Sequence, residues 1–231
     1  MLAGLMPLNV SSFGGEIDSV YRLILYIVAF WFVLVEGLLL FFAVRYRRQP
    51  GVRAFYNRGE TRGETAWILV PAAIVLLLDL GIDSAGNRAW RMVKDTLPPA
   101  QMEVLVTAKQ FNWEFTYPGP DGKLGTADDV VIENELHVPA DQVVHLTLDS
   151  KDVIHSFWAP NLRLKQDIVP GRRIKAWFEA TRPGTYELAC SELCGFGHYS
   201  MRGTITVHTP SDFARWAKEN LKPAASASQS Q

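Results

Sequence analysis

Cysteine, histidine and an excess of either charge are all scarce in this 231-residue chain. It has two cysteines and five histidines, and its 23 basic and 24 acidic residues leave a formal net charge of −1. No basic surface of the kind that binds nucleic acid is therefore expected. The motif Cys-x-x-Cys-His does not occur, so no c-type haem is attached covalently to the chain.

The first part of the chain is dominated by apolar runs. Residues 1–15 lack the basic start and the small-residue cleavage site of a secretory signal peptide. The run over residues 20–44 would span roughly 37 Å as a helix, enough to cross a bilayer core. A shorter run over 66–82 carries Pro71 in its first turns, where proline costs least. The sequence therefore predicts a transmembrane helical hairpin over residues 16–90.

Charge in the link between the two runs predicts the orientation of this hairpin. The link is rich in arginine (Arg45, Arg47, Arg48, Arg53, Arg58 and Arg62). Short basic loops stay in the cytoplasm. We therefore expect a two-pass protein of a bacterial-type inner membrane, with both termini and the domain after the hairpin on the periplasmic side. Glu36, an ionisable group at membrane depth, favours contact with another membrane subunit.

Residues 91–217 have the pattern of an all-β domain. Short alternating or β-branched segments, punctuated by turn residues, predict strands over 102–108, 112–117, 130–136, 142–150, 173–180, 184–189 and 203–208. Such a series is typical of a β-sandwich or barrel. An amphipathic helix is expected over 211–221. The Ala-, Ser- and Gln-rich end, taken from residue 218 to 231, is expected to be disordered.

Both cysteines lie in one stretch, Cys190-Ser-Glu-Leu-Cys194-Gly-Phe-Gly-His198-Tyr-Ser-Met201. Thiolate, imidazole and thioether together are the ligand set that selects copper. With two thiolates, a two-copper centre that shares one electron over both metals is favoured. The expected role is electron transfer, since no general base or open position is evident beside the ligands.

This ligand set needs a second imidazole, and His155 is the candidate. It follows the predicted strand 142–150 in the segment Asp152-Val-Ile-His155-Ser-Phe-Trp. The remaining histidines, His137, His145 and His208, are interpreted as structural.

Alternative interpretations remain for two segments. An exported domain could pair Cys190 with Cys194 as a disulfide, or hold tetrahedral zinc with two histidines. Neither alternative uses Met201, which favours copper. The loop from Asp121 to Asp129 has clustered carboxylates that would suit calcium, but it lacks the EF-hand spacing, so a plain hairpin loop is favoured.

At these residues the chain resembles subunit II of the haem–copper cytochrome c oxidases, over about residues 16–217. The family's pattern Cys-Ser-Glu-x-Cys-Gly-x-x-His-x-x-Met is matched in full. Further matches are the Asp152–His155 segment, Lys165-x-Asp167-x-x-Pro170-Gly171-Arg172, and Glu64-Thr-x-Trp67-x-x-x-Pro71.

The resemblance implies a cupredoxin-like Greek-key barrel that holds a binuclear CuA centre of two copper ions. It assigns the bridging thiolates to Cys190 and Cys194 and the terminal imidazoles to His155 and His198. Met201 and the backbone carbonyl of Glu192 become weak axial ligands.

Outside the copper centre, the resemblance implies three further roles. The side chain of Glu192 would reach a magnesium ion at the interface with the catalytic subunit, supported by Asp167. Glu64 would lie at the mouth of a proton pathway. Asp152 would help to position the ligand loop or the docking face.

The implied function is that of an electron-accepting subunit of a respiratory terminal oxidase. It would take electrons from a cytochrome c-type donor, in some cases within a supercomplex, and pass them to haem in catalytic subunit I. That subunit would reduce oxygen to water with proton translocation, and subunit III is a further expected partner.

One departure from the family concerns the arrival of electrons. The family has tryptophan at the first aromatic position of its run Gln-Trp-x-Trp-x-Tyr-x-Tyr, where this chain has Phe111. Trp113 keeps the second position, and is equally compatible with a place in the core of the barrel.

Three other classes of protein share some of these features. Nitrous oxide reductase has a similar copper loop, but on a soluble enzyme with a large second domain. Subunit II of quinol oxidases lacks the copper ligands that are present here. A copper-delivery protein would need labile ligation.

Overall fold

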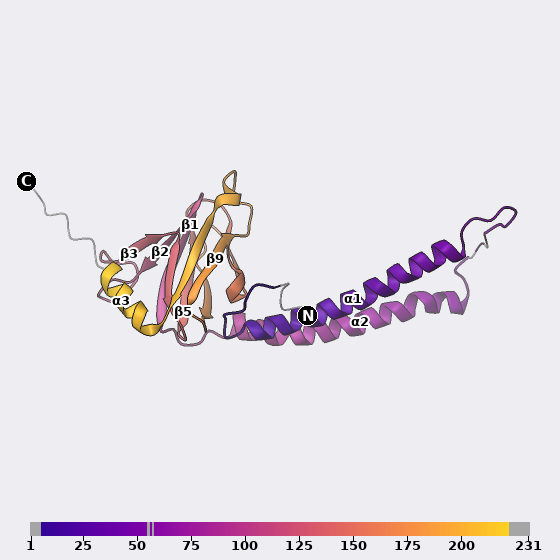
Figure 1. Ribbon diagram of the computed structural model, residues 1–231, viewed down its shortest axis with the longest axis horizontal. Helices are drawn as coiled ribbons and strands as arrows, with labels where there is room; N and C mark the ends of the chain where they lie inside the picture. Colours follow the sequence, from indigo (N-terminus) through magenta and orange to yellow (C-terminus); the bar gives the residue numbers. More distant parts are fainter. Residues whose placement is uncertain (1–5, 55, 57, 222–231) are drawn as a thin grey trace, which may run out of the picture. The chain divides into compact units, whose positions relative to one another are not determined.

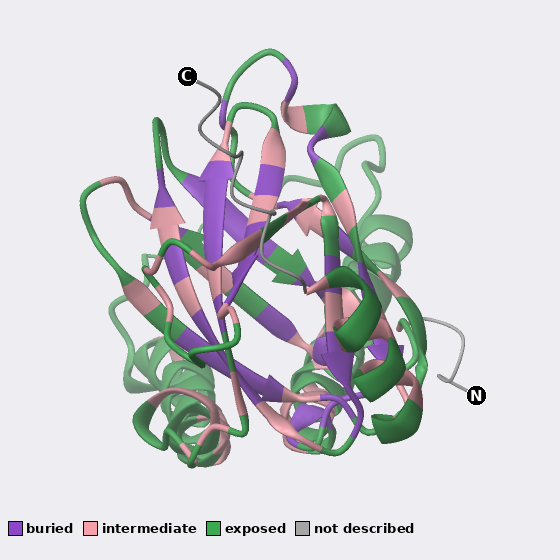
Figure 2. Ribbon diagram, turned by 90° about the vertical axis from the view of Figure 1, so that its left-hand side faces the viewer, coloured by how far each residue is buried: buried purple, intermediate pink, exposed green. Residues whose placement is uncertain are grey.

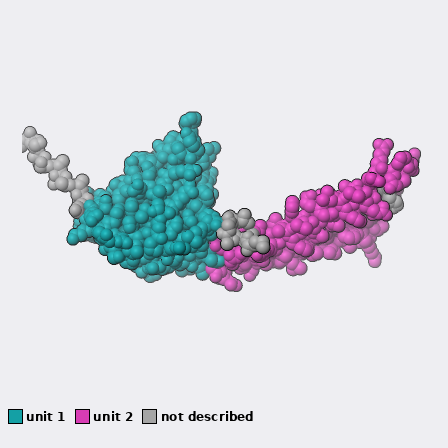
Figure 3. Space-filling view, viewed as in Figure 1, with its two compact units in different colours: residues 1–15, 92–231 teal, residues 16–91 magenta. Residues whose placement is uncertain are grey.

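The computed structural model describes residues 6–54, 56 and 58–221. The chain divides into two compact units, one of residues 1–15 and 92–231 and one of residues 16–91 (Figure 3). The tail expected from residue 218 lies mostly outside the described residues, although the last helix continues to Asn220.

The helical unit consists mainly of α1 (Gly14–Arg45) and α2 (Arg62–Trp90), and α2 continues into a short π-helix, Arg91–Asp95 (Figure 1). Both helices are long and apolar enough to cross a membrane, and none of the residues in their most apolar windows is buried. Exposed leucine, valine and phenylalanine along a helix need lipid or another apolar partner. The expectation of two apolar N-terminal helices is confirmed.

The other unit is built from two five-stranded sheets. The first has the order β3–β2–β1–β5–β8, formed by β1 (Met102–Lys109), β2 (Asn112–Tyr117), β3 (Val130–Glu133), β5 (Val143–Ser150) and β8 (Ile174–Glu179). The second has the order β4–β10–β9–β6–β7, formed by β4 (Glu135–Pro139), β6 (His155–Ala159), β7 (Leu164–Ile168), β9 (Gly184–Cys190) and β10 (Arg202–His208).

Both sheets are mixed, because β1 pairs parallel with β5 and β4 pairs parallel with β10. Where side chains alternate along a strand, one face is buried and the other is exposed. In β1, for example, Val104, Val106 and Ala108 are buried. Buried residues follow the strands, whereas the long helices are exposed (Figure 2). The expected cupredoxin-like all-β domain after two apolar helices is confirmed, as a sandwich of two sheets.

The single strand predicted over 130–136 is wrong. The chain changes sheets there, from β3 beside β2 to β4 beside β10. Asn134 lies at the change with a φ of 61°, a left-handed conformation that asparagine tolerates better than most residues. Its side-chain oxygen accepts the backbone N–H of Trp113 at 2.9 Å, which satisfies a group that the break in the ladder leaves free.

Strands β6 and β7 were not predicted from the sequence. Each has only five residues, and β7 (Leu-Lys-Gln-Asp-Ile) has too few apolar residues to show a pattern. The last helix, α3 (Pro210–Asn220), begins one residue earlier than expected and is capped by Thr209, whose hydroxyl accepts the N–H of Asp212.

Residues just before α1 belong to the β unit. Ser11 forms a bridge with Ala180, and the N–H of Val10 donates to the carbonyl of Asn161 at 2.9 Å. Val10 and Phe13 are buried, and the ring of Phe13 packs edge-on against Trp177 with centroids 5.2 Å apart. No pattern in residues 10–13 predicted this contact.

Candidate metal centre

Neighbouring strands bring His155 close to Cys190. His155 begins β6 and Cys190 ends β9, and the two strands pair with Phe157 opposite Cys190. The pairing therefore places an imidazole beside a thiol that is far away in the sequence. His155 is fully buried and Cys190 is nearly so, with 8% of its surface exposed.

The rest of the candidate ligands lie on the connection from β9 to β10. Its two ends are joined, because the N–H of Cys190 donates to the carbonyl of Met201 at 3.0 Å. His198 begins a turn of 3-10 helix, His198–Ser200, within this connection. We call residues 190–201 the ligand loop.

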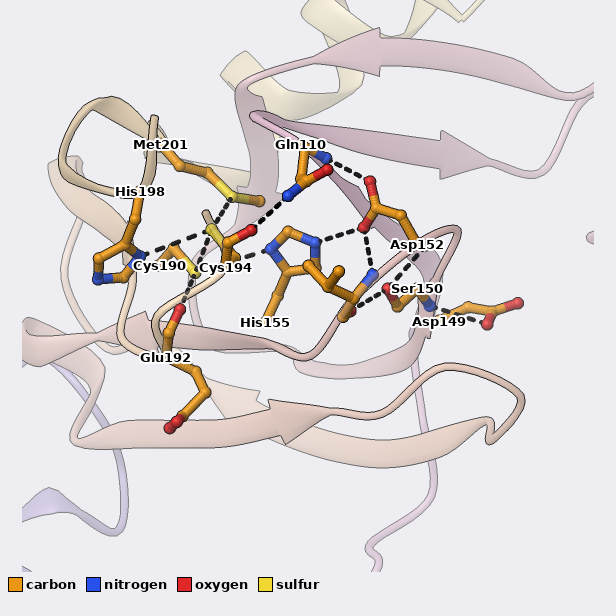
Figure 4. Close-up of polar contacts among 11 residues, drawn as sticks. Gln110, Asp149, Ser150, Asp152, His155, Cys190, Glu192, Cys194, His198 and Met201 are labelled. Atoms are coloured by element: carbon orange, nitrogen blue, oxygen red, sulfur yellow. Dashed lines mark hydrogen bonds and ion pairs between the residues drawn. The ribbon is translucent and has the colours of Figure 1, made fainter. Parts of the chain in front are cut away.

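Six potential donor atoms from these residues converge (Figure 4). The two cysteine Sγ atoms lie 3.8 Å apart. Cys190 Sγ is 3.8 Å from His155 Nδ1 and 3.2 Å from the carbonyl oxygen of Glu192. Cys194 Sγ is 3.6 Å from His198 Nδ1 and 3.8 Å from Met201 Sδ. Each sulfur thus has its own imidazole and its own weak third neighbour.

The donor set fits soft metal ions. Thiolates, imidazoles and a thioether suit copper, and the buried position excludes water from most of the donors. In the part of the chain that the structure describes, His155, Cys190 and Cys194 form the one group of three metal-binding side chains whose ligand atoms lie within 4.8 Å of one another. The cysteines are free, and their 3.8 Å separation is far beyond a disulfide bond of about 2.05 Å.

The two thiols differ in acidity. Burial opposes ionisation of Cys190, but its hydrogen bonds, of which the one with His155 contributes most, together outweigh burial and lower the pKa of the thiol to about 6. Burial and the neighbouring charge of Cys190 raise the pKa of Cys194 to about 12. Cys190 therefore loses its proton at a lower pH than Cys194 does. A metal that binds both sulfurs must displace the second proton.

Asp152 orients the imidazole of His155. The Nε2–H of His155 donates to Asp152 Oδ1 at 2.8 Å, which leaves Nδ1 facing the sulfur of Cys190. Burial lowers the pKa of His155, but the bonds with Cys190 and Asp152 outweigh it and leave the pKa raised. A carboxylate on the far nitrogen is the usual support of a metal-binding histidine.

Comparison with known proteins decides the family. The family pattern described as "Cytochrome C oxidase subunit II, periplasmic domain" matches residues 107–208. Cytochrome c oxidase subunit 2 of Thermostichus vulcanus is 31% identical over an alignment 267 positions long. The alignment covers 94% of this chain and 79% of that protein. The chain belongs to the cytochrome c oxidase subunit II family.

A second relative agrees with this assignment, and one solved structure is similar to part of the chain. The alternative cytochrome c oxidase subunit 2 of Bradyrhizobium diazoefficiens is 32% identical over 227 residues, covering 89% of this chain and 80% of that protein. The crystal structure of the periplasmic domain of subunit II of cytochrome oxidase from Bradyrhizobium japonicum is 29% identical, with a TM-score of 0.49, covering 54% of this chain and 96% of that chain.

This subunit II is therefore a membrane subunit of cytochrome c oxidase, a haem–copper oxidase complex with a separate catalytic subunit. The family and the donor set both indicate copper as the metal. The assignment confirms the expectations of an oxidase subunit and of membrane association.

The two aromatic residues proposed for electron acceptance lie at different depths. Phe111 is at the surface, and its ring covers Gly197 of the ligand loop so closely that a Cβ there would lie 2.5 Å from the ring. Trp113 is fully buried, with its ring edge-on to His155 at 6.4 Å between centroids. Both residues contact the ligand region, Phe111 from outside and Trp113 from within the core.

Of the two groups expected to serve magnesium, Asp167 bonds to Ser156, and Ser156 bonds to Ser191, the residue before Glu192. The hydroxyl of Ser156 donates to Asp167 Oδ1 at 2.7 Å, and its carbonyl accepts the N–H of Ser191 at 3.0 Å. The carboxylate of Glu192 is exposed and points away from the sulfur atoms, whereas its carbonyl points toward them (Figure 4).

Glu64 caps the start of α2. Its carboxylate accepts the N–H of Thr61 at 2.7 Å, and the hydroxyl of Thr61 accepts the N–H of Glu64 at 3.3 Å. The reciprocal pair is a capping box, which stabilises the first turn of a helix. Its signature, Thr-x-x-Glu, was present in the sequence.

The other three histidines bond to groups outside the metal cluster. His145 Nε2 lies 2.7 Å from the carbonyl of Pro98, and His137 Nδ1 lies 2.9 Å from His208 Nε2. In the Asp121–Asp129 loop the carboxylates accept backbone N–H groups of the loop itself, for example that of Gly125 at 2.7 Å by Asp129.

Sequence reasoning missed Gln110 as a residue of the site. Its side-chain amide donates to the carbonyl of Cys194 at 2.5 Å, and its backbone N–H donates to Asp152 at 2.7 Å. Gln110 is the first residue of the family's aromatic run, and this position was the one feature of the sequence that could have indicated its role in the site.

Proposed function

We propose that this chain is the electron-accepting subunit of its oxidase and that it holds a binuclear CuA centre of two copper ions. The thiolates of Cys190 and Cys194 would hold both metal ions, and His155 and His198 would each supply an imidazole. Met201 and the carbonyl of Glu192 would supply weaker donors. The observation that carries this assignment is the pair of sulfur atoms 3.8 Å apart, each with an imidazole nitrogen within 3.8 Å.

When bound, such a centre accepts and releases single electrons with little change of geometry. The protein supports this role by rigidity, since His155 and Met201 are fully buried and Cys194 is 3% exposed. Electrons from a cytochrome c-type donor arrive near Phe111 and Trp113. They leave toward haem in catalytic subunit I, where oxygen is reduced to water with proton translocation.

The outer side of the ligand loop supports contact with partners. Leu193, Phe196 and Tyr199 are 79%, 95% and 76% exposed. Large apolar side chains grouped at the surface mark interaction sites. We propose that subunit I covers part of this surface, that subunit III belongs to the complex, and that the donor docks nearby, either freely or within a supercomplex.

Magnesium would bind where subunit II meets subunit I. Glu192 supplies a carboxylate that points away from the copper ligands, as such an ion would require. Asp167 supports the same region through its bond with Ser156. Oxygen ligands of this kind suit a hard cation, which usually keeps several water molecules as well.

The arginine-rich link between α1 and α2 favours a cytoplasmic location for the link. Both termini and the copper domain then lie on the periplasmic side of a bacterial-type inner membrane. Glu64, at the cytoplasmic start of α2, would serve the mouth of a proton pathway. We take residues 16–90 as the membrane hairpin and 91–217 as the copper domain.

Metal analysis of the purified oxidase tests the central proposal. We expect Cys190→Ser to remove two copper ions per complex and the mixed-valence near-infrared and electron paramagnetic resonance signals, while the haem spectra persist. A loss of one copper ion or none, or the absence of mixed-valence signals from the unaltered complex, would contradict the CuA assignment.

A further inference from the structure

A short turn between β1 and β2 reaches the ligand loop from outside. Gln110, in this turn, donates its Nε2–H to the backbone carbonyl of Cys194 at 2.5 Å. Its backbone N–H donates to Asp152 Oδ2 at 2.7 Å. Figure 4 shows Gln110 between these two partners. The same residue therefore contacts the segment of one proposed ligand and the support of another.

Asp152 completes the connection. Its Oδ1 accepts the Nε2–H of His155 at 2.8 Å and the N–H of Val153 at 2.7 Å. A continuous series of hydrogen bonds thus joins His155, Asp152, Gln110 and Cys194. The two proposed copper ligands at its ends come from β6 and from the ligand loop, which the backbone bond from Ser191 to Ser156 also joins.

Packing holds the amide of Gln110 in place although the residue is at the surface. Gly195 has a φ of +135°, a conformation that side chains rarely adopt, and a Cβ there would lie 2.6 Å from Gln110 Nε2. At Gly197 a Cβ would lie 2.5 Å from the ring of Phe111. The absence of side chains at both glycines lets the turn lie directly on the backbone of the ligand loop.

We propose that Gln110 is a positioning residue of the copper centre, which fixes Cys194 relative to His155 through Asp152. The inference rests on the proposed CuA function. Hydrogen bonds around metal ligands set their orientation, and loss of such a partner typically costs about 10–100-fold in metal affinity or activity. The hydrogen bonding near a copper-bound thiolate also tunes its reduction potential.

The decisive variant is Gln110→Glu, which keeps the shape of the side chain but replaces the N–H donor by an oxygen. That oxygen would face the carbonyl of Cys194. Gln142→Glu makes the same change in the turn between β4 and β5, at the opposite end of β5 from Asp152. It is the matched control for the added charge.

Both variants are compared in the purified oxidase complex. We expect Gln110→Glu to shift the reduction potential and the copper hyperfine pattern of the centre, and to speed copper loss to a chelator roughly tenfold. Gln142→Glu should leave all three unchanged. Asp152→Asn should also speed copper loss. In the double variant Gln110→Glu with Asp152→Asn, the increase in copper loss should be smaller than the product of the two single increases, because both residues belong to one series of hydrogen bonds.

Several results would overturn the inference. The inference is contradicted if Gln110→Glu behaves as Gln142→Glu does. It is also contradicted if the effects of the Gln110 and Asp152 substitutions on copper loss multiply independently. Gln110→Ala removes the donor without adding charge and covers the case in which Gln110→Glu fails to assemble; unchanged copper release in Gln110→Ala would also refute the proposal. An unaltered complex without two copper ions in this domain would refute the CuA function itself.

Discussion

The backbone N–H of Cys190 donates to the carbonyl of Met201, so the first and last candidate ligands of the loop are held 3.0 Å apart at the backbone. This bond continues the antiparallel ladder of β9 and β10, in which Ala189 faces Arg202. This bond of the sheet joins the two ends of the ligand loop. Changes to a single side chain within it should alter the metal centre without unfolding the domain.

Replacement of Met201 by leucine tests this expectation most directly. Met201 is fully buried with its Sδ 3.8 Å from Cys194 Sγ, and leucine has a similar volume. We expect the variant to keep both copper ions and to show a raised reduction potential, because loss of a weak electron donor destabilises the oxidised state more. Redox titration of the near-infrared band measures the shift. Met102→Leu, in β1, is the control, and an unchanged potential in Met201→Leu would exclude an axial role.

Gly197→Ala should disturb the contact between the ligand loop and the β1–β2 turn. The added Cβ would lie 2.5 Å from the ring of Phe111, too close for the two to coexist. Overpacking of this kind costs about 1–3 kcal/mol. We expect a lower melting temperature and less bound copper. The double variant with Phe111→Ala should recover both, since it removes the obstructing ring. Failure of this recovery would show that Gly197 matters for another reason.

The histidine pair of β4 and β10 predicts loss of stability in acid. His137 Nδ1 lies 2.9 Å from His208 Nε2, and the ring of His137 stacks on Trp216 of α3 with centroids 4.2 Å apart. Burial lowers the pKa of both histidines. At His137 the neighbouring Glu135 opposes this shift. At His208 the charge of His137 adds to the shift and the charge of Asp212 opposes it.

The unfolded chain therefore binds protons more readily than the folded one below the ordinary histidine pKa of about 6.5. Stability is complete above that pH and falls as the pH drops further through the folded values. Melting curves of the full-length protein at pH 8 and pH 5.5 measure this. His137→Asn combined with His208→Asn should flatten the dependence, and an equal loss in this variant would assign the effect to other groups.

The sequence predicted the ligands of the site better than it predicted the strands that hold them. Cys190, Cys194, His198 and Met201 lie within one stretch, so their proximity followed from spacing alone. His155 was found because the ligand set needed a second imidazole. The strand that carries it was not predicted, since five residues give too short a pattern for an assignment.

Contacts between distant segments could not be predicted in this way. The bond from Gln110 to Cys194 joins a turn to a loop 84 residues away, and it depends on two glycines whose open space appears only when the strands are assembled. The change of sheet at Asn134 is similar, because both flanking segments have strand patterns and only tertiary pairing separates them.

Thr61 and Glu64 allow the proposed proton role to be separated from helix capping. Thr61→Ala breaks the capping box at a cost of about 1 kcal/mol but leaves the carboxylate of Glu64 in place. Glu64→Gln keeps an oxygen that can accept the N–H of Thr61, but cannot carry a proton. We expect Glu64→Gln to slow turnover and proton release by the oxidase, and Thr61→Ala to leave both near normal. The opposite order would assign Glu64 to helix capping alone.

Phe111 offers a test of how electrons reach the metal. Its ring lies over Gly197, one residue from His198, and 36% of the residue is exposed. Removal of an exposed aromatic group on the proposed route should slow electron acceptance from the native donor without loss of copper. We therefore expect Phe111→Ala to lower turnover, and Phe111→Trp to preserve it because tryptophan restores the residue found in the family. Rapid mixing of reduced donor with the oxidase measures this step alone. If Phe111→Ala accepts electrons at the unaltered rate, the route does not include this ring, and buried Trp113 beside His155 becomes the residue to change next.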